Sequence, residues 1–254
     1  MDNMTTAAKY IRDSENIIAF TGAGVSTESN IPDFRSAVGL FNSTRGNFDY
    51  PPEKMLSHSF FMEHAEVFFE YYLSRLIHKE ALPNKCHLAF ATLEDAGKLK
   101  AVITQNIDGL HQAAGSRNVL ELHGSVHRNY CMKCRRSFSL DYVTCTAGRI
   151  AESSLVPVCD KCGGIVRPDV VLYEEMLDTE LMEKAVEYIR KADVLIVAGT
   201  SLVVYPAAGL VSYYKGSKLI LLNKSQTSYD SRANILINGS AGEIMADIME
   251  MAGL

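Results

Sequence analysis

The chain of 254 residues carries 25 lysine and arginine residues against 30 aspartate and glutamate residues, a formal net charge of −5. Hydrophobic residues make up 47% of the sequence and charged residues 22%, which excludes a disordered chain. The acidic balance lacks the basic excess that is typical of direct nucleic-acid binding, so we expect none. The longest apolar runs, such as 194–198, are far shorter than the ~20 residues that span a membrane.

The amino-terminal segment, MDNMTTAAKYIRDSEN, contains acidic residues and lacks the apolar region of a signal peptide. We therefore expect a cytoplasmic protein with no membrane partner. In that reducing compartment the six cysteines are better explained by metal ligation or free thiols than by disulfides.

Short apolar, β-branched runs alternate with helical patterns along the chain. The runs are 16–20, 100–104, 118–122, 192–198, 218–222 and 234–237, and the helical patterns are 4–11, 85–96, 179–190 and 241–251. This alternation predicts an α/β fold with a doubly wound, Rossmann-like parallel sheet. The aromatic-rich stretch 57–77 predicts a further helical segment, and residues 126–165, which hold five of the six cysteines, predict a small inserted module.

Polar clusters follow five of the predicted strands. They are Thr21-Gly22-Ala23-Gly24, Gln105-Asn106-Ile107-Asp108, His123, Gly199-Thr200-Ser201 and Asn223-Lys224. Since the carboxyl ends of parallel strands meet at one edge of the sheet, where ligands bind in open α/β folds, we expect these clusters to form a binding site.

The first cluster opens a strand-to-helix turn of the kind that holds a pyrophosphate. The match to the dinucleotide fingerprint G-x-G-x-x-G is incomplete, because Thr27 stands at its third glycine. The loop that follows carries Phe34 and Arg35, which suit a planar cationic ring and a phosphate. A Pro-containing surface turn with a buried Phe explains the same loop.

Two other polar positions also have structural alternatives. The amides of Gln105 and Asn106, with the Asp108 carboxylate, offer partners for a carboxamide and for sugar hydroxyls. Asp108 also suits the amino-terminal cap of a following helix. His123 is a candidate general base, although a lone histidine is more often structural.

Four cysteines form two C-x-x-C pairs, Cys131/Cys134 and Cys159/Cys162. Two hairpins that each supply two thiolates are typical of one tetrahedral zinc site, closed to substrate and therefore structural. Cys145 lies between the pairs and is expected not to be a ligand, and Cys86 is expected to be a packed thiol.

Together these motifs resemble the sirtuins, the NAD-dependent protein-lysine deacylases, and most of all their short bacterial members. The residues that carry the resemblance span nearly the whole chain: 22–26, 31–35, 105–111, 122–124, the four paired cysteines, 167–171 and 199–202. The resemblance implies a Rossmann-type NAD-binding domain of residues 1–32, 83–125 and 166–254. A smaller domain would combine a helical insert, 33–82, with a zinc-binding module, 126–165, that holds one Zn²⁺ per chain.

The resemblance also implies roles for individual residues. The dinucleotide would contact Ala23, Thr27, Arg35, Gln105, Thr200, Ser201, Asn223, Lys224 and Ala241. The nicotinamide pocket would comprise Phe34, Ile107 and Asp108, while Asn106 would order the ribose or a water and His123 would be the general base. An acyl-lysine protein or peptide would lie as an extended strand between Val171-Leu172-Tyr173 and the segment 202–205, which includes Val203.

The implied reaction consumes NAD without hydride transfer. The acyl oxygen would attack the ribose carbon as nicotinamide leaves, and the products would be free lysine, nicotinamide and O-acyl-ADP-ribose. The sequence departs from the family at Asn30, usually Gly, and at Tyr173-Glu174-Glu175, commonly Phe-Gly-Glu. Asn tolerates left-handed backbone geometry, so we expect the first turn to survive.

The pair Tyr72 and Arg75 is similar to a Tyr-x-x-Arg pair of sirtuins that prefer negatively charged acyl groups. Their i, i+3 spacing places both on one helix face, where they would hold a succinyl carboxylate. The alternative is an amphipathic helix with Tyr72 packed and Arg75 solvated, in an enzyme that removes acetyl groups.

Two other functions fit the same motifs. A mono-ADP-ribosyltransferase would use the same NAD cleavage with another acceptor. A non-catalytic NAD-sensing module would need the binding residues alone, and the presence of His123 and Asn106 argues against it.

Overall fold

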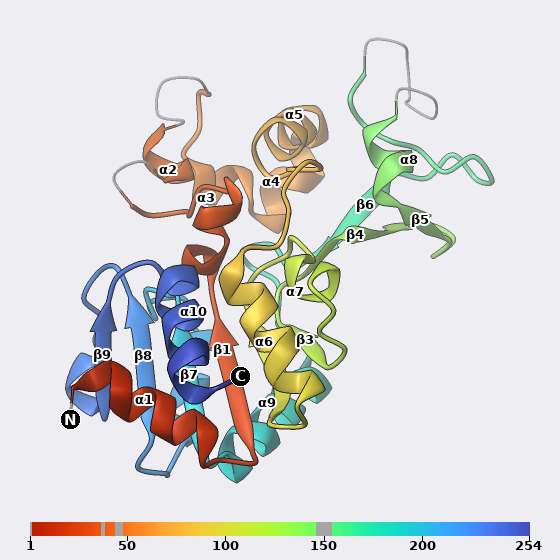
Figure 1. The fold of residues 1–254 in the computed structure, drawn as a ribbon. Coiled ribbons are helices and arrows are strands. Elements are labelled where there is room, and N and C mark those ends of the chain that lie inside the picture. Colours follow the sequence, from red (N-terminus) through yellow and green to blue (C-terminus); the bar gives the residue numbers. More distant parts are fainter. Residues whose placement is uncertain (1, 37–38, 44–47, 146–153) are drawn as a thin grey trace.

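The computed structural model describes residues 2–36, 39–43, 48–145 and 154–254. Figure 1 shows a larger part built on a parallel sheet and a smaller part of helices and an antiparallel sheet. The strands are β1 (Ile17–Thr21), β2 (Leu99–Thr104), β3 (Val119–Glu121), β4 (Gly124–Cys131), β5 (Ser137–Ser139), β6 (Val166–Val170), β7 (Val194–Ala198), β8 (Leu219–Asn223) and β9 (Ile235–Asn238). The helices are α1 (Asn3–Arg12), α2 (Leu40–Ser43), α3 (Pro52–Met55), α4 (His58–Glu63), α5 (Ala65–Arg75), α6 (Lys85–Asp95), α7 (Leu110–Ala113), α8 (Leu140–Thr144), α9 (Thr179–Lys191) and α10 (Ala241–Ala252), with 3-10 helices η1 (Ala23–Ser29), η2 (Ala207–Tyr213) and η3 (Asp230–Arg232). Every helix in the described ranges is too short or too polar to cross a bilayer.

The larger sheet has the strand order β3-β2-β1-β7-β8-β9, and the paired strands run parallel. Every residue of β1 and β7 is buried, as expected for central strands covered on both faces. The doubly wound fold is confirmed, and each apolar run predicted from sequence lies within two residues of its strand at either end. The chain turns to one side of β1 and then to the other, so β1 and β7 form the topological switch point.

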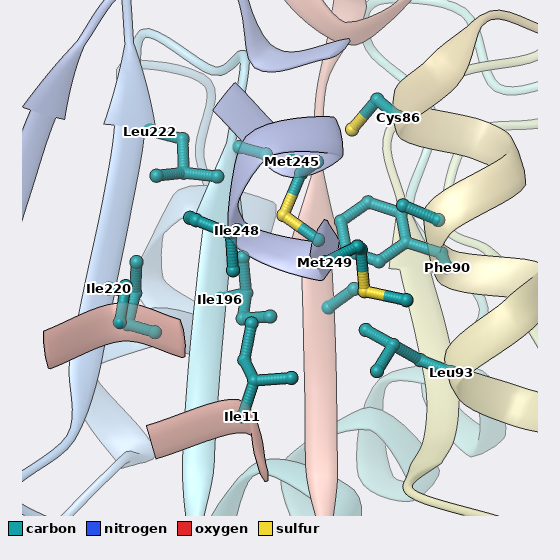
Figure 2. Close-up of a cluster of buried hydrophobic side chains, with 14 of the residues drawn as sticks. Ile11, Cys86, Phe90, Leu93, Ile196, Ile220, Leu222, Met245, Ile248 and Met249 are labelled. Carbon is teal, nitrogen blue, oxygen red and sulfur yellow. The ribbon is translucent and has the colours of Figure 1, made fainter. Parts of the chain in front are cut away.

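Helices cover both faces of this sheet (Figure 1). One face packs against α1, α6 and α10, and the other against α9 and η2. Figure 2 shows how Met245, Ile248 and Met249 of α10 fill the space over the strands, between Ile11 of α1 and Phe90 of α6. Burial of such a side chain contributes ~1.5–3 kcal/mol to folding, and unbranched methionines fill irregular gaps. Cys86 is fully buried in this layer, which confirms it as a packed thiol.

The smaller part has its own hydrophobic core, shared between helices α2–α5 and the sheet β5-β4-β6. The predicted helical stretch 57–77 is not continuous but divides into α4 and α5 at His64. The His64 ring lies 4.7 Å from the Phe60 ring and 5.8 Å from the Tyr50 ring, measured between centroids. The backbone of His64 lies outside helical geometry, with a φ of −133°. Strand β6 begins at residue 166, the first residue of the last range that we assigned to the NAD-binding domain, and pairs antiparallel with β4 of the small sheet.

The turns after β1 and β7 meet so closely that a side chain at Gly199 has no room. A Cβ atom there would lie 2.3 Å from the backbone nitrogen of Val25, and the φ of Gly199 is +59°. Gly97 has a similar φ of +72°, but a Cβ atom there would meet no atom within 4 Å.

These two glycines separate backbone strain from steric conflict. Gly97→Ala should lower the free energy of unfolding by ~1–2 kcal/mol, the cost of left-handed geometry. Gly199→Ala should lower it by several kcal/mol more, since the switch point must move apart. Urea unfolding of both variants measures the difference, and equal losses would contradict the close approach of the two turns.

Candidate functional site

The turn after β1 lies against the turn after β7 at the switch point. The backbone N–H of Gly22 donates to the Ala198 carbonyl at 3.1 Å, and that of Gly24 donates to the Gly199 carbonyl at 2.8 Å. The turn leads into the 3-10 helix η1 rather than the α-helix that a dinucleotide fingerprint usually opens. Asn30 ends η1 in left-handed geometry, with φ of 61°, so this turn tolerates Asn in place of Gly as expected.

Ser26 joins the first polar cluster to the second. Its hydroxyl donates to the Asp108 carboxylate at 2.7 Å and accepts from the Asn106 amide at 3.1 Å. Ser26 is 1% exposed and was not among our predicted site residues. A small hydroxyl residue within a glycine-rich turn was the available signal, but its partners lie about 80 positions further along the chain.

Asp108 combines the two roles that the sequence left open. Its second carboxylate oxygen accepts from the backbone N–H of Leu110 at 2.9 Å, which supports the first turn of α7. The cap position itself is Gly109, in left-handed geometry, so Asp108 is not the N-cap residue. Hydrogen bonds with Leu110 and Ser26 fix the orientation of the carboxylate at the strand edge.

The clusters after β2, β7 and β8 are also brought together. The Gln105 side-chain amide donates to the Thr200 hydroxyl at 3.0 Å, and the Asn223 amide donates to the Thr200 carbonyl at 3.2 Å. Glu28 accepts from the backbone N–H of Gly242 at 2.7 Å and so ties η1 to the start of α10, beside Ala241. The polar edge predicted from sequence is therefore a connected network in the fold.

The remaining predicted NAD contacts differ in exposure. Thr27 is half-buried and donates to the Gly24 carbonyl at 2.9 Å, and Ala23, Phe34 and Ile107 are also half-buried. Three residues with exposed surface, Arg35, Ser201 and Lys224, complete the set.

His123 occupies the carboxyl end of β3, next to Gln105. Its Nδ1 donates to the backbone carbonyl of Gln105 at 2.9 Å, which leaves the lone pair on Nε2. Burial lowers the pKa of His123 below its ordinary value of 6.5, and the hydrogen bond to Gln105 offsets part of this effect. The ring is therefore neutral at pH 7 and able to accept a proton.

The segment that follows β6 is firmly held by the rest of the chain. The N–H of Val171 donates to the His123 carbonyl at 3.0 Å, that of Leu172 to the Glu175 carboxylate at 2.9 Å and that of Tyr173 to the Leu56 carbonyl at 2.9 Å. The Leu172 and Tyr173 carbonyls also accept backbone N–H groups, from Glu175 at 3.1 Å and His58 at 3.0 Å, so a peptide strand laid along this segment would find most of its backbone groups already paired.

A polar hollow of about 440 Å³ lies beside this segment. It is lined by His58, Tyr130, Arg167, Asp169, Val170, Val171, Glu174, Glu175 and Met176. It includes Val171 but none of the predicted NAD contacts, so it is a neighbour of the polar strand edge rather than the edge itself. Arg167 and His58 both bind Glu175 there, at 2.6 Å and 2.8 Å, and hold the pKa of that carboxyl near 2 against the cost of its burial.

The four paired cysteines form one cluster. Their sulfur atoms all lie within 4.8 Å of one another, with 3.5 Å from Cys131 to Cys162 and 3.6 Å from Cys134 to Cys159. Zinc–sulfur bonds of ~2.3 Å in a tetrahedron place sulfur atoms ~3.8 Å apart, so the cluster fits a Zn²⁺ ion. Cys145 is exposed and lies outside the cluster, as expected.

Tyr72 and Arg75 lie on α5 in the core of the smaller part. Tyr72 is 1% exposed and its ring stacks on Phe68, with 5.7 Å between centroids. Burial raises the pKa of the phenol. Within the described residues, the Tyr72 hydroxyl and the Arg75 Nε are buried without a hydrogen-bond partner.

Comparisons with known proteins agree with this arrangement. A sequence profile of the Sir2 family matches residues 22–206. The NAD-dependent protein deacetylase of Clostridium tetani is 58% identical over 253 residues, covering 100% of both chains, and that of Clostridium acetobutylicum is 57% identical over 249 residues, covering 98% of this chain and 99% of its own.

Solved structures give the same result. A Sir2 protein with a deacetylated p53 peptide and 3′-O-acetyl-ADP-ribose superposes with a TM-score of 0.88 at 36% identity, with 100% of both chains covered. A Sir2 homologue in complex with NAD has a TM-score of 0.82 at 39% identity, covering 98% of this chain and 93% of the homologue. The chain therefore belongs to the Sir2 family of NAD-dependent protein deacetylases.

Proposed function

We propose that this chain deacetylates protein lysines with consumption of NAD, and that His123 is the general base. The observation that carries this assignment is the bond from His123 Nδ1 to the Gln105 carbonyl, which fixes the tautomer and leaves Nε2 to receive a proton. When bound, NAD supplies the ADP-ribose group that accepts the acetyl group as nicotinamide leaves. His123 takes the proton from a ribose hydroxyl, and its burial keeps the ring neutral for that purpose.

The dinucleotide is assigned to the polar edge at the switch point. Glycines at 22 and 24 let a backbone approach closely, and the linked side chains of Gln105, Thr200 and Asn223 present amides and hydroxyls. Asp108 and Asn106, oriented by Ser26, are assigned to the nicotinamide and ribose. The Sir2 homologue bound to NAD supports this placement because it covers the same part of the chain.

The acetyl-lysine substrate is assigned to the segment 171–173 and the facing segment 202–205. Tyr173, Val203 and Tyr205 are 38%, 54% and 68% exposed, as befits a surface that a peptide covers. A Sir2 protein bound to a p53 peptide and NAD, at 36% identity and a TM-score of 0.84, supports a peptide substrate.

The cysteine cluster is assigned a structural Zn²⁺ ion. All four ligand positions are taken by thiolates from two hairpins, which leaves no open position for substrate. The metal would stabilise the small sheet and take no part in the chemistry.

A second acyl group is favoured by one observation. The unpaired, buried polar atoms of Tyr72 and Arg75 would both be satisfied by the carboxylate of a succinyl-lysine.

The reaction is tested by following masses when protein, NAD and an acetyl-lysine peptide are incubated together. Deacetylated peptide and O-acetyl-ADP-ribose are expected in equal amounts.

His123→Ala should lower the rate by ~10²–10⁴-fold while ADP-ribose binding persists, because only proton transfer is lost. In the wild type, kcat/KM should fall on acidification with a midpoint below pH 6.5, since the lowered pKa must be crossed before the base is protonated.

His78→Gln is the matched control, because the His78 ring is hydrogen-bonded to the Arg75 carbonyl and is not among the residues assigned to NAD or the peptide. Activity of His123→Ala within tenfold of the wild type would refute the base assignment, and ADP-ribosylated protein in place of deacetylated peptide would favour the transferase alternative.

Metal analysis tests the zinc assignment. The wild type should contain one zinc per chain, and Cys159→Ser should lose the metal and melt at lower temperature, since metal binding and folding of the module are coupled. Cys145→Ser should keep both the metal and the melting temperature, because Cys145 lies outside the cluster. Folded, active wild-type protein without zinc would contradict the assignment.

Acyl choice is tested on one peptide that carries acetyl-, succinyl- or butyryl-lysine. If the carboxylate is bound by Arg75, desuccinylation is appreciable and falls ~10–100-fold in Arg75→Met, as expected for a charge-assisted hydrogen bond of ~1.5–3 kcal/mol. An inert succinyl peptide, or equal loss of all three activities in Arg75→Met, would assign Arg75 to the packing of α5.

A further inference from the structure

Tyr173 is hydrogen-bonded to Arg35, the residue that the sirtuin resemblance assigns to the dinucleotide. The Nη2 group of Arg35 donates a hydrogen bond to the Tyr173 hydroxyl, with 3.3 Å between the nitrogen and the oxygen. Arg35 lies on the loop after η1, whereas Tyr173 lies in the segment assigned to the peptide, 138 positions away. This contact needs the phenolic oxygen of Tyr173, which a phenylalanine would lack.

The backbone of Tyr173 is fixed on both sides of its peptide unit. Its N–H donates to the Leu56 carbonyl at 2.9 Å, and its carbonyl accepts from the N–H of His58 at 3.0 Å. These bonds form a parallel bridge between residue 173 and residue 57. The backbone that carries the Tyr173 ring is therefore held rigidly.

Glu174, the next residue, adds further hydrogen bonds that hold this backbone in place. Glu174 adopts left-handed geometry, with φ of 76°, a conformation that favours glycine. Its carboxylate accepts from the backbone N–H of Ser59 at 2.9 Å and from the Ser59 hydroxyl at 3.0 Å. Two hydrogen bonds at the start of α4 thus hold a backbone conformation that costs ~1–2 kcal/mol for a residue with a side chain.

In contrast to the backbone of Tyr173, the side chain of Arg35 is exposed to solvent. Its guanidinium lies 5.4 Å from the Phe41 ring centroid, and its backbone N–H donates to the Asp33 carboxylate at 2.9 Å. A guanidinium carries five N–H donors, so one hydrogen bond to Tyr173 is compatible with further hydrogen bonds to a pyrophosphate. The hydrogen bond to the Tyr173 hydroxyl limits the orientations that the exposed guanidinium of Arg35 can adopt.

We propose that Tyr173 is a positioning residue that couples the peptide site to the NAD site through Arg35. A peptide bound along 171–173 immobilises the ring, the ring holds the guanidinium toward the pyrophosphate, and the nucleotide binds more tightly. This proposal rests on the proposed function, in which 171–173 contacts the peptide, together with the contact between Arg35 and the dinucleotide that the sirtuin resemblance implies.

The coupling is measured with ADP-ribose and an acetyl-lysine peptide, which bind together without reacting because no nicotinamide can leave. Calorimetry of the wild type should give an ADP-ribose Kd about fivefold lower at saturating peptide, within the usual range of such couplings. The peptide Kd should fall by the same factor when ADP-ribose is saturating, as linkage requires. In Tyr173→Phe the factor should approach one.

Tyr213→Phe is the matched control. Tyr213 is 39% exposed against 38% for Tyr173, and its ring lies 5.1 Å from the Arg190 guanidinium, a contact that phenylalanine preserves. This variant should keep the wild-type coupling factor. A coupling factor near one in the wild type, or one unchanged in Tyr173→Phe, would overturn the proposal.

Arg35→Met separates this proposal from the assignment of the site. It should weaken ADP-ribose binding with and without peptide, and adding Tyr173→Phe to it should have no further effect on coupling. Weaker ADP-ribose binding in Arg35→Met together with intact coupling in Tyr173→Phe would overturn the role of Tyr173 alone. Unchanged ADP-ribose binding in Arg35→Met would overturn the nucleotide contact itself and the coupling with it.

Discussion

The close approach of two backbone turns at the centre of the sheet determines the rest of the site. Gly24 and Gly199 are in hydrogen-bond contact, and neither position has space for a Cβ atom. This contact sets where η1 begins, and so it brings Ser26 over the carboxyl end of β2. It also places Thr200 within reach of Gln105. The polar groups of three strands form one network because the backbones beneath them touch.

Sequence reasoning located the parallel sheet because its strands are short, continuous apolar runs buried on both faces, such as β1 and β7. It also located the cysteine cluster, since C-x-x-C spacing fixes local hairpin geometry. Local patterns carry both of these features. They did not place the break at His64, whose ring packs against the rings of Tyr50 and Phe60.

Contacts between distant segments explain what else the sequence missed. Ser26 lies in a motif that the sequence singled out, but its role shows only when Asn106 and Asp108 are folded against it. The sequence showed glutamate at 174 as a departure from the sirtuin pattern but not what holds it. In the fold its carboxylate is bound by Ser59, so the residue that strains the backbone also supplies the bonds that retain it.

The occupied N–H groups of Val171, Leu172 and Tyr173 have a consequence for the choice of substrate. The carbonyls of Leu172 and Tyr173 are occupied as well, by the N–H groups of Glu175 and His58, so a strand laid beside this segment finds few backbone groups left to pair with. Backbone pairing then contributes less to the affinity for a peptide, and contacts between side chains contribute more. On this side of the peptide, sequence preference would therefore depend on what packs against exposed side chains such as the Tyr173 ring.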